Sequence, residues 1–136
     1  MSKDFIFKTK VYYEDTDAGG VVYYANYLKF TERARTEVIN ELGFTNKFLI
    51  EKYGAYIVVK SCNFDFKKSA FLEDELKIIS SINFISKTSF KMIQKIKKKD
   101  QLIALSNIHL VVINKNGKIL RIPEALFFKL NQHLLK

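Results

Sequence analysis

The hydrophobic period of the chain changes twice, and this pattern limits the folds open to it. Residues 5–14 alternate roughly between apolar and basic side chains, as a strand does. From about Asn26 to Leu42, apolar side chains recur at spacings of three and four, which predicts one long amphipathic helix ended by Gly43. From residue 54 the period is two, almost to the end. The predicted order is therefore a strand, a long helix and then a series of strands.

Short turns divide the second part of the chain into four predicted strands. Their approximate ranges are 56–66, 76–84, 90–96 and 102–113. A short helix is expected after Pro123. Successive strands joined by short turns indicate an antiparallel sheet. We therefore expect an α+β fold in which a sheet of about five strands lies against one long helix, with residues 1–136 forming one domain.

Composition restricts the compartment and the class of ligand. No apolar run approaches the ~20 residues of a membrane-spanning helix, and the N-terminus does not resemble a signal peptide. A single cysteine, Cys62, favours a reducing cytoplasm. The net charge of +9 disfavours a cationic ligand. It fits solvated lysines, an anionic ligand, nucleic acid or acidic lipid headgroups, and charge alone does not separate these.

Several kinds of site are not supported by the sequence. The calcium-loop pattern that Asp15 and Asp17 begin fails at its later ligand positions, so no metal is expected. Neither a G-x-S-x-G elbow nor a nucleotide-binding glycine pattern is present. Cys62 lies mid-strand and is expected to be a buried, inert thiol. His109 is expected to be a core or interface histidine.

Residues 12–27, YYEDTDAGGVVYYANY, hold the strongest candidate site. Its acids are Glu14, Asp15 and Asp17. An aspartate before Ala-Gly-Gly is a natural turn former. Three features favour chemistry at Asp17 instead: Gly19 and Gly20 give a ligand access to the backbone, an apolar wall follows, and a helix start offers unpaired N–H groups. Asp17 is therefore the candidate base or nucleophile, and the other two acids are expected to be structural.

The segment VYYEDTDAGGVVYYANYLKFTERARTEVI resembles the signature of hot-dog-fold acyl-CoA thioesterases of the 4-hydroxybenzoyl-CoA thioesterase type, in particular the bacterial YbgC-like branch. The residues that match the family pattern are Asp17, Ala18, Gly20, Val21, Val22, Tyr23, Asn26 and Tyr27. The match covers about the first third of the chain. It implies a long central helix wrapped by a curved antiparallel sheet. It also implies a homodimer joined sheet edge to sheet edge, often paired into a homotetramer, with active sites at the dimer interface.

The resemblance also implies roles for individual residues. Asp17 would attack the thioester carbonyl or activate water, and the backbone N–H of Tyr24 would polarise the carbonyl oxygen. Gly19 and Gly20 would let the acyl-thioester pass close to the chain. Many family members carry histidine where this chain has Tyr24, so a histidine side-chain role is absent while the amide is kept.

The implied substrate is acyl-CoA, with acyl-carrier protein as the other possible carrier, and no cofactor is implied. Basic residues on the strands would bind the phosphates of CoA, and the candidates are Lys60, Lys68, Lys87 and Lys91. Val59 and Ser61 are expected to share the strand face that reaches the acyl group. At the level of the family, the resemblance implies a cytoplasmic hydrolase of lipid metabolism. Peripheral membrane contact is left open, and no nucleic-acid partner is expected.

Two alternatives remain open. One is a hot-dog hydratase or dehydratase acting on acyl thioesters, which usually pairs a histidine with an acid, and His109 and His133 are poorly placed for that. The other is a non-catalytic basic module that binds lipid or RNA, against which the lack of a recognisable nucleic-acid motif argues.

Overall fold

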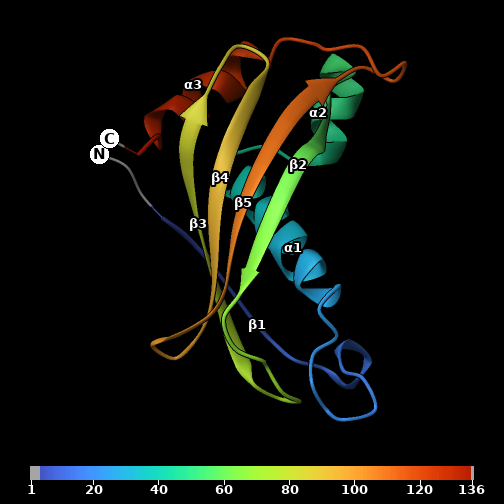
Figure 1. Ribbon diagram of the computed structural model, residues 1–136. Coiled ribbons are helices and arrows are strands. Elements are labelled where there is room, and N and C mark those ends of the chain that lie inside the picture. The colour runs from blue at the N-terminus through green and yellow to red at the C-terminus, as the bar shows by residue number, and fades with distance from the viewer. Residues whose placement is uncertain (1–3, 136) are drawn as a thin grey trace.

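The computed structural model describes residues 4–135 and shows a five-stranded antiparallel sheet in front of a long helix (Figure 1). The elements in chain order are β1 (Phe5–Lys10), η1 (Tyr13–Asp15), α1 (Asn26–Glu41), α2 (Asn46–Tyr53), β2 (Tyr56–Phe66), β3 (Glu75–Ile85), β4 (Ser89–Lys98), β5 (Gln101–Ile113) and α3 (Glu124–Gln132). The strand order is β1-β3-β4-β5-β2, and every neighbouring pair is antiparallel. The expected α+β hot-dog architecture is confirmed.

The long helix α1 forms where the period of three and four predicts it. Its buried stripe includes Tyr27, Phe30, Ala34 and Val38, which pack between the helix and the sheet. Gly43 follows the helix with φ of +100°, a left-handed conformation that ends helices. The burial of this stripe, more than helix propensity, holds α1 against the sheet.

The helix α2 is the element that the hydrophobic pattern does not predict. Thr45 caps its start by accepting a hydrogen bond from the Phe48 N–H at 2.9 Å, and Gly54 follows it with φ of +64°. Of its residues only Leu49 is buried, so no apolar stripe is visible in the sequence. The first strand is also shorter than expected, because residues 13–15 turn into η1.

A β-bulge at Lys60 changes which side chains of β2 face α1. The pairing of β2 with β5 shifts register between Val59 and Ser61. Val59 lies opposite Leu110, which is buried on the helix side, whereas Ser61 lies opposite His109 on the outer side. The expectation that Val59 and Ser61 share a face is therefore wrong, because an inserted residue reverses the alternation beyond it.

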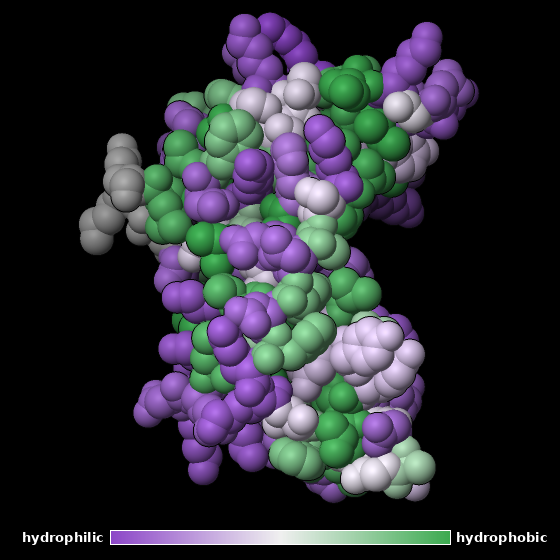
Figure 2. Space-filling view, in the orientation of Figure 1, coloured by the Kyte–Doolittle hydropathy of each residue, from purple (hydrophilic) through white to green (hydrophobic). Residues whose placement is uncertain are grey.

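The outer face of the sheet, which points away from α1, carries a row of lysines. Lys8, Lys77 and Lys97 are directly opposite one another across β1, β3 and β4. Figure 2 views this face and shows hydrophilic side chains gathered over the lower part of these strands, next to apolar ones. Like charges directly opposite each other are destabilising, so this row is a poor surface for self-association.

No helix among residues 4–135 has the length and apolar character required to span a membrane.

Candidate active site

Asp17 opens a tight turn between η1 and α1. Its N–H donates to the Val21 carbonyl at 2.9 Å, and its own carbonyl accepts from the Gly20 N–H at 3.0 Å. The carboxylate oxygen Oδ1 accepts from the Gly19 N–H at 2.8 Å and from the Val21 N–H at 3.4 Å. The second oxygen, Oδ2, has no partner within residues 4–135, and the residue is exposed. Asp17 is thus a turn former and also presents one free carboxylate oxygen.

Gly19 and Gly20, which follow Asp17, are glycine for different structural reasons. Gly20 has φ of +78°, which a residue with a Cβ adopts only with strain. Gly19 has no such φ, but a Cβ there would lie 3.4 Å from Oδ1 of Asp17. Gly20 is therefore needed to close the turn, and Gly19 leaves space beside the carboxylate.

The start of α1 offers unpaired amides close to this turn in the chain. The Asn26 N–H donates to the Tyr23 carbonyl at 2.8 Å, whereas the N–H groups of Tyr24 and Ala25 donate to no acceptor in the described part of the chain. No side chain caps the helix, and its first turn holds no acidic residue. The amides therefore lie at the positive end of α1, where developing negative charge is stabilised.

Asp15 ties the turn to the helix. It is 3% exposed, and its carboxylate accepts from the Tyr12 N–H at 2.9 Å and from the Asn26 side-chain amide at 3.2 Å. Its carbonyl accepts from the Tyr23 N–H at 3.2 Å. The expectation that Asp15 is structural is confirmed. The side chain of Asn26 binds this carboxylate, a role that its position in the motif does not explain.

The segment between β2 and β3 supports the turn from behind. The Val22 N–H donates to the Ala70 carbonyl at 2.9 Å, and the Leu72 N–H donates to the Gly20 carbonyl at 3.0 Å. The Ala70 N–H donates in turn to the hydroxyl of Tyr27 at 3.1 Å. Burial raises the pKa of Tyr27, which keeps this hydroxyl neutral. Residues 67–74 thus fix the turn that carries Asp17, and sequence reasoning did not find them because the contacts are between distant parts of the chain.

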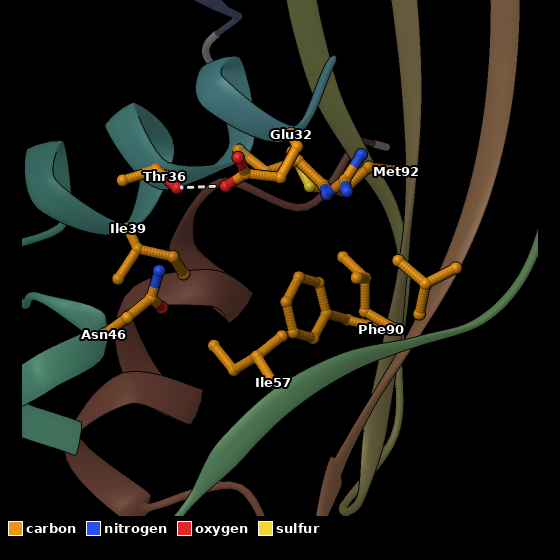
Figure 3. A pocket seen from close by; sticks show the side chains of 10 residues that line it. Glu32, Thr36, Ile39, Asn46, Ile57, Phe90 and Met92 are labelled. Carbon is orange, nitrogen blue, oxygen red and sulfur yellow. Dashed lines mark hydrogen bonds between the residues drawn. The ribbon is translucent and has the colours of Figure 1, made fainter. Parts of the chain in front are cut away.

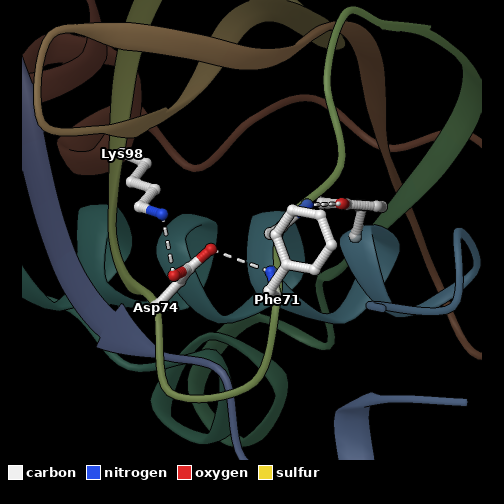
Figure 4. Close-up of polar contacts among 5 residues, drawn as sticks. Phe71, Asp74 and Lys98 are labelled. Carbon is white, nitrogen blue, oxygen red and sulfur yellow. Dashed lines mark hydrogen bonds and ion pairs between the residues drawn. The ribbon is translucent and has the colours of Figure 1, made fainter. Parts of the chain in front are cut away.

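An ion pair closes this supporting segment onto β4 (Figure 4). One oxygen of Asp74 accepts from the Phe71 N–H at 2.8 Å, and the other lies 2.9 Å from Nζ of Lys98. Asp74 therefore joins the loop to the strand with both of its carboxylate oxygens.

A cavity of about 160 Å³ lies between α1 and the sheet, and its polar lining consists of Glu32, Arg35, Thr36 and Asn46 (Figure 3). Its apolar lining includes Ile39, Ile57, Val59, Phe90 and Leu110. Val59 is 46% exposed and forms part of the wall that β2 contributes. A cavity of this kind suits the apolar part of a ligand.

The remaining site candidates lie apart from Asp17 within one protomer. Lys60, Ser61 and Lys91 are on or next to the outer face, where Ser61 and Lys91 line a second cavity with His109. Lys87 lies in the β3–β4 turn, at the end of the sheet opposite the start of α1 (Figure 1). Lys68 belongs to the segment that supports the turn. The structure joins Asp17, Gly19 and Gly20 in one turn, places Tyr24 shortly after it at the start of α1, and leaves the lysines dispersed.

The structure corrects one expectation about Cys62, which lies opposite the buried Ile108 on the helix side of β2. Cys62 is exposed rather than buried. Nε2 of His109 is buried without a hydrogen-bond partner in the described chain. Burial, with Lys91 and Lys60 nearby, lowers the pKa of His109, so the ring is neutral at pH 7. No acid pairs with this histidine among residues 4–135, which disfavours the histidine–acid pair of a hydratase.

Comparison with known proteins gives the family. Residues 11–130 match the model of the Thioesterase-like superfamily. The chain is 34% identical to the acyl-CoA thioesterase YbgC of Haemophilus influenzae over 114 residues, 84% of each chain. It is 41% identical to the acyl-CoA thioester hydrolase YbgC of Escherichia coli over 92 residues, 68% of each chain.

A solved structure agrees with the sequence relatives. A probable thioesterase from Bartonella henselae superposes with a TM-score of 0.86 at 31% identity, covering 89% of this chain and all of that one. The match of the family model spans both the turn that carries Asp17 and strands β2 to β5. This chain belongs to the Thioesterase-like superfamily.

Proposed function

We propose that this protein hydrolyses acyl-CoA thioesters to the free acid and CoA. One observation carries the proposal: the free Oδ2 of Asp17 and the unpaired Tyr24 amide lie on either side of one tight turn. The names of the relatives in Haemophilus influenzae and Escherichia coli support acyl-CoA as the substrate.

In this mechanism Asp17 supplies the carboxylate and Tyr24 the oxyanion donor. The carboxylate removes a proton from water as it attacks the carbonyl carbon, or attacks that carbon itself to form an anhydride that water then opens. The carbonyl oxygen becomes negative and accepts a hydrogen bond from the Tyr24 N–H. Loss of one such donor raises a barrier by ~2.7–4 kcal/mol. In the general-base route the C–S bond breaks as the tetrahedral intermediate collapses, and the CoA thiolate takes a proton from the protonated Asp17. In the nucleophilic route the C–S bond breaks as the anhydride forms, before water opens it, and the CoA thiolate takes a proton from water.

We further propose that the active unit is at least a dimer joined through β2. This strand is at an edge of the sheet, is 11 residues long and, within residues 4–135, pairs only with β5. Long free edges invite pairing with another strand. Val59 and Phe66 are each 46% exposed beside this edge, which a second copy would cover. Pairing would also bring lysines of one protomer toward the site of the other, where Lys60, Lys68, Lys87 and Lys91 remain candidates for the CoA phosphates.

On the same family resemblance, we place the reaction in the cytoplasm and in lipid metabolism. A thiol-release assay over short, long and aromatic acyl-CoAs tests the function, and light scattering after size-exclusion chromatography tests the assembly. Thiol release from at least one acyl-CoA, by a dimer or tetramer, is expected. Hydration of crotonyl-CoA without thiol release, or salt-sensitive RNA binding without turnover, would overturn the proposal.

Substitution of the two glycines should separate stability from activity. Gly20→Ala is expected to lower the free energy of unfolding by about 1 kcal/mol, because alanine at positive φ is strained. Gly19→Ala is expected to leave stability nearly unchanged and to lower kcat/KM, because its methyl group would contact Oδ1 of Asp17. Urea unfolding and thiol release measure the two effects. Equal loss of stability in both variants would contradict this division.

A further inference from the structure

Arg35 is a half-buried cation of α1 that forms no ion pair with a carboxylate of residues 4–135. Its one hydrogen bond within the described chain runs from Nη1 to Oε1 of Gln94 at 3.1 Å. A guanidinium has five N–H donors. Glu32, one turn earlier, forms no ion pair with Arg35, and its carboxylate instead accepts from the Thr36 hydroxyl at 2.7 Å. Most of the hydrogen-bonding capacity of Arg35 is therefore unused by the protein.

Gln94 holds Arg35 in place without neutralising it. Gln94 is fully buried on β4, and its side-chain amide donates to the Thr31 carbonyl and to the Ser80 hydroxyl, each at 3.0 Å. Both amide hydrogens are thereby used, which turns Oε1 toward Arg35. A neutral acceptor orients the guanidinium without forming an ion pair with it, and the nearby Glu32 carboxylate stabilises the positive charge less than burial disfavours it. Burial accordingly lowers the pKa of Arg35, yet the group stays charged at neutral pH.

The guanidinium faces the cavity between α1 and the sheet. Arg35 lines that cavity together with Ile39, Ile57, Val59 and Phe90. Figure 3 shows the apolar side chains of helix and strands converging on the same space. Glu32, Thr36 and Asn46 line the cavity on the helix side, and the sheet side is apolar. A cation with free donors in such a pocket is suited to one anionic or strongly accepting group on an otherwise apolar ligand.

The cavity is in line with the proposed reaction centre. Leu28, Glu32 and Arg35 follow one another at spacings of four and three, so they lie along one side of α1, and Tyr24 lies in the turn just before the helix. Leu28 is an apolar residue that is 47% exposed on this side. Eleven residues separate Tyr24 from Arg35, or about 16 Å at 1.5 Å per residue, and the lean of helical side chains toward the N-terminus shortens the gap.

Strand β2 forms the other wall of this path. The ring of Phe66 lies 6.3 Å from the ring of Tyr24, and Val59 and Ile57 continue along β2 to the cavity. The backbone contacts of α1 are mainly with β1 and β3, so the helix packs away from β2. An acyl chain whose carbonyl is at the Tyr24 amide has an apolar path toward Arg35.

We propose that Arg35 is a specificity-determining residue that binds a carboxylate at the far end of the acyl group. The inference rests on the proposed thioesterase function. It assigns the preferred substrates to the CoA monothioesters of medium-length dicarboxylic acids rather than to unsubstituted acyl-CoAs of equal length.

The test compares suberyl-CoA with octanoyl-CoA, which have the same number of carbons and differ in the terminal carboxylate. The wild type should have the higher kcat/KM for suberyl-CoA. Arg35→Met should lower that value about 10- to 100-fold, as expected for lost hydrogen bonds to a charged group, and leave octanoyl-CoA hydrolysis unchanged or faster. For suberyl-CoA, the kcat/KM of Arg35→Lys should lie between those of the wild type and Arg35→Met. Arg33→Met, an exposed cation on the same helix, should change neither rate.

A second measurement does not depend on how the variants fold. Free suberate should inhibit the wild type at lower concentration than octanoate does. Equal inhibition by both acids, or an equal loss on both thioesters in Arg35→Met, would overturn the role of Arg35 and leave the thioesterase function standing. Failure of the wild type to release CoA from any acyl-CoA would instead overturn the proposed function.

Discussion

The Asp17→Asn variant is expected to keep the wild-type fold and to lose at least about 10²-fold in kcat for acyl-CoA hydrolysis, the lower end for loss of a general base. Asparagine retains an oxygen that can accept from the Gly19 and Val21 N–H groups, so the turn survives. The neutral amide can neither attack the carbonyl nor deprotonate water. The change in the free energy of unfolding should be within about 0.5 kcal/mol, as for other exposed positions.

Single-turnover thiol release and urea unfolding measure these two quantities on the same preparation. Glu14→Gln is the matched control, because Glu14 is an exposed acid three residues earlier with no polar partner in the described chain. That variant should hydrolyse acyl-CoA at the wild-type rate. Asp17→Asn turnover within threefold of the wild type would remove Asp17 from the mechanism.

The elements that sequence predicts best are those whose apolar side chains repeat over many residues. The helix expected at 26–42 is α1, and the four later strands are found because their side chains alternate, with one face buried in β3, β4 and β5. The helix α2 is not predicted, since Leu49 alone is buried there. The sequence predicts the wrong sheet face for the side chains of β2 beyond Lys60. The bulge cannot be recognised from the alternation of β2 alone, because it is defined by the pairing with the partner strand.

In the candidate site too, the sequence predicts the local features but not the contacts between distant elements. The turn at Asp17 and the amides at the start of α1 are local in sequence, so one motif predicts both. The Asp74–Lys98 pair and the Gln94–Arg35 hydrogen bond join side chains from different elements. The sequence around each residue gives no indication of its partner, because the packing of α1 and of the β2–β3 segment against β4 brings the partners together.

Asp15 and Asp17 are two residues apart and have opposite roles, set by burial. Asp15 points inward, where both carboxylate oxygens accept hydrogen bonds, while Asp17 is exposed and keeps one oxygen free. A carboxylate whose oxygens are both engaged by the protein is a poor nucleophile, and one that is exposed contributes little to stability. The same residue type therefore stabilises the turn at one position and is available for chemistry at the other.

This division predicts that Asp15→Ala is the most destabilising single change in the turn. It would leave the Tyr12 N–H and the buried Asn26 amide without acceptors, and each unsatisfied group costs about 1–3 kcal/mol. We expect the free energy of unfolding to fall by about 2–4 kcal/mol. Because Asn26 begins α1, the Tyr24 amide should also lose its position, so activity should fall as well.

Urea unfolding and thiol release at a temperature where the variant is folded separate the two effects of Asp15→Ala. Asn26→Ala is the matched variant, since it removes the partner and leaves the Tyr12 contact. If the carboxylate–amide hydrogen bond couples the turn to the helix, the double variant should lose less stability than the sum of the single losses. Two outcomes would contradict this prediction: additive losses of stability, or an Asp15→Ala protein as stable as Asp17→Asn. Either would show that the buried carboxylate does not hold the turn. The free energy that stabilises the turn would then come from the contacts of residues 67–74.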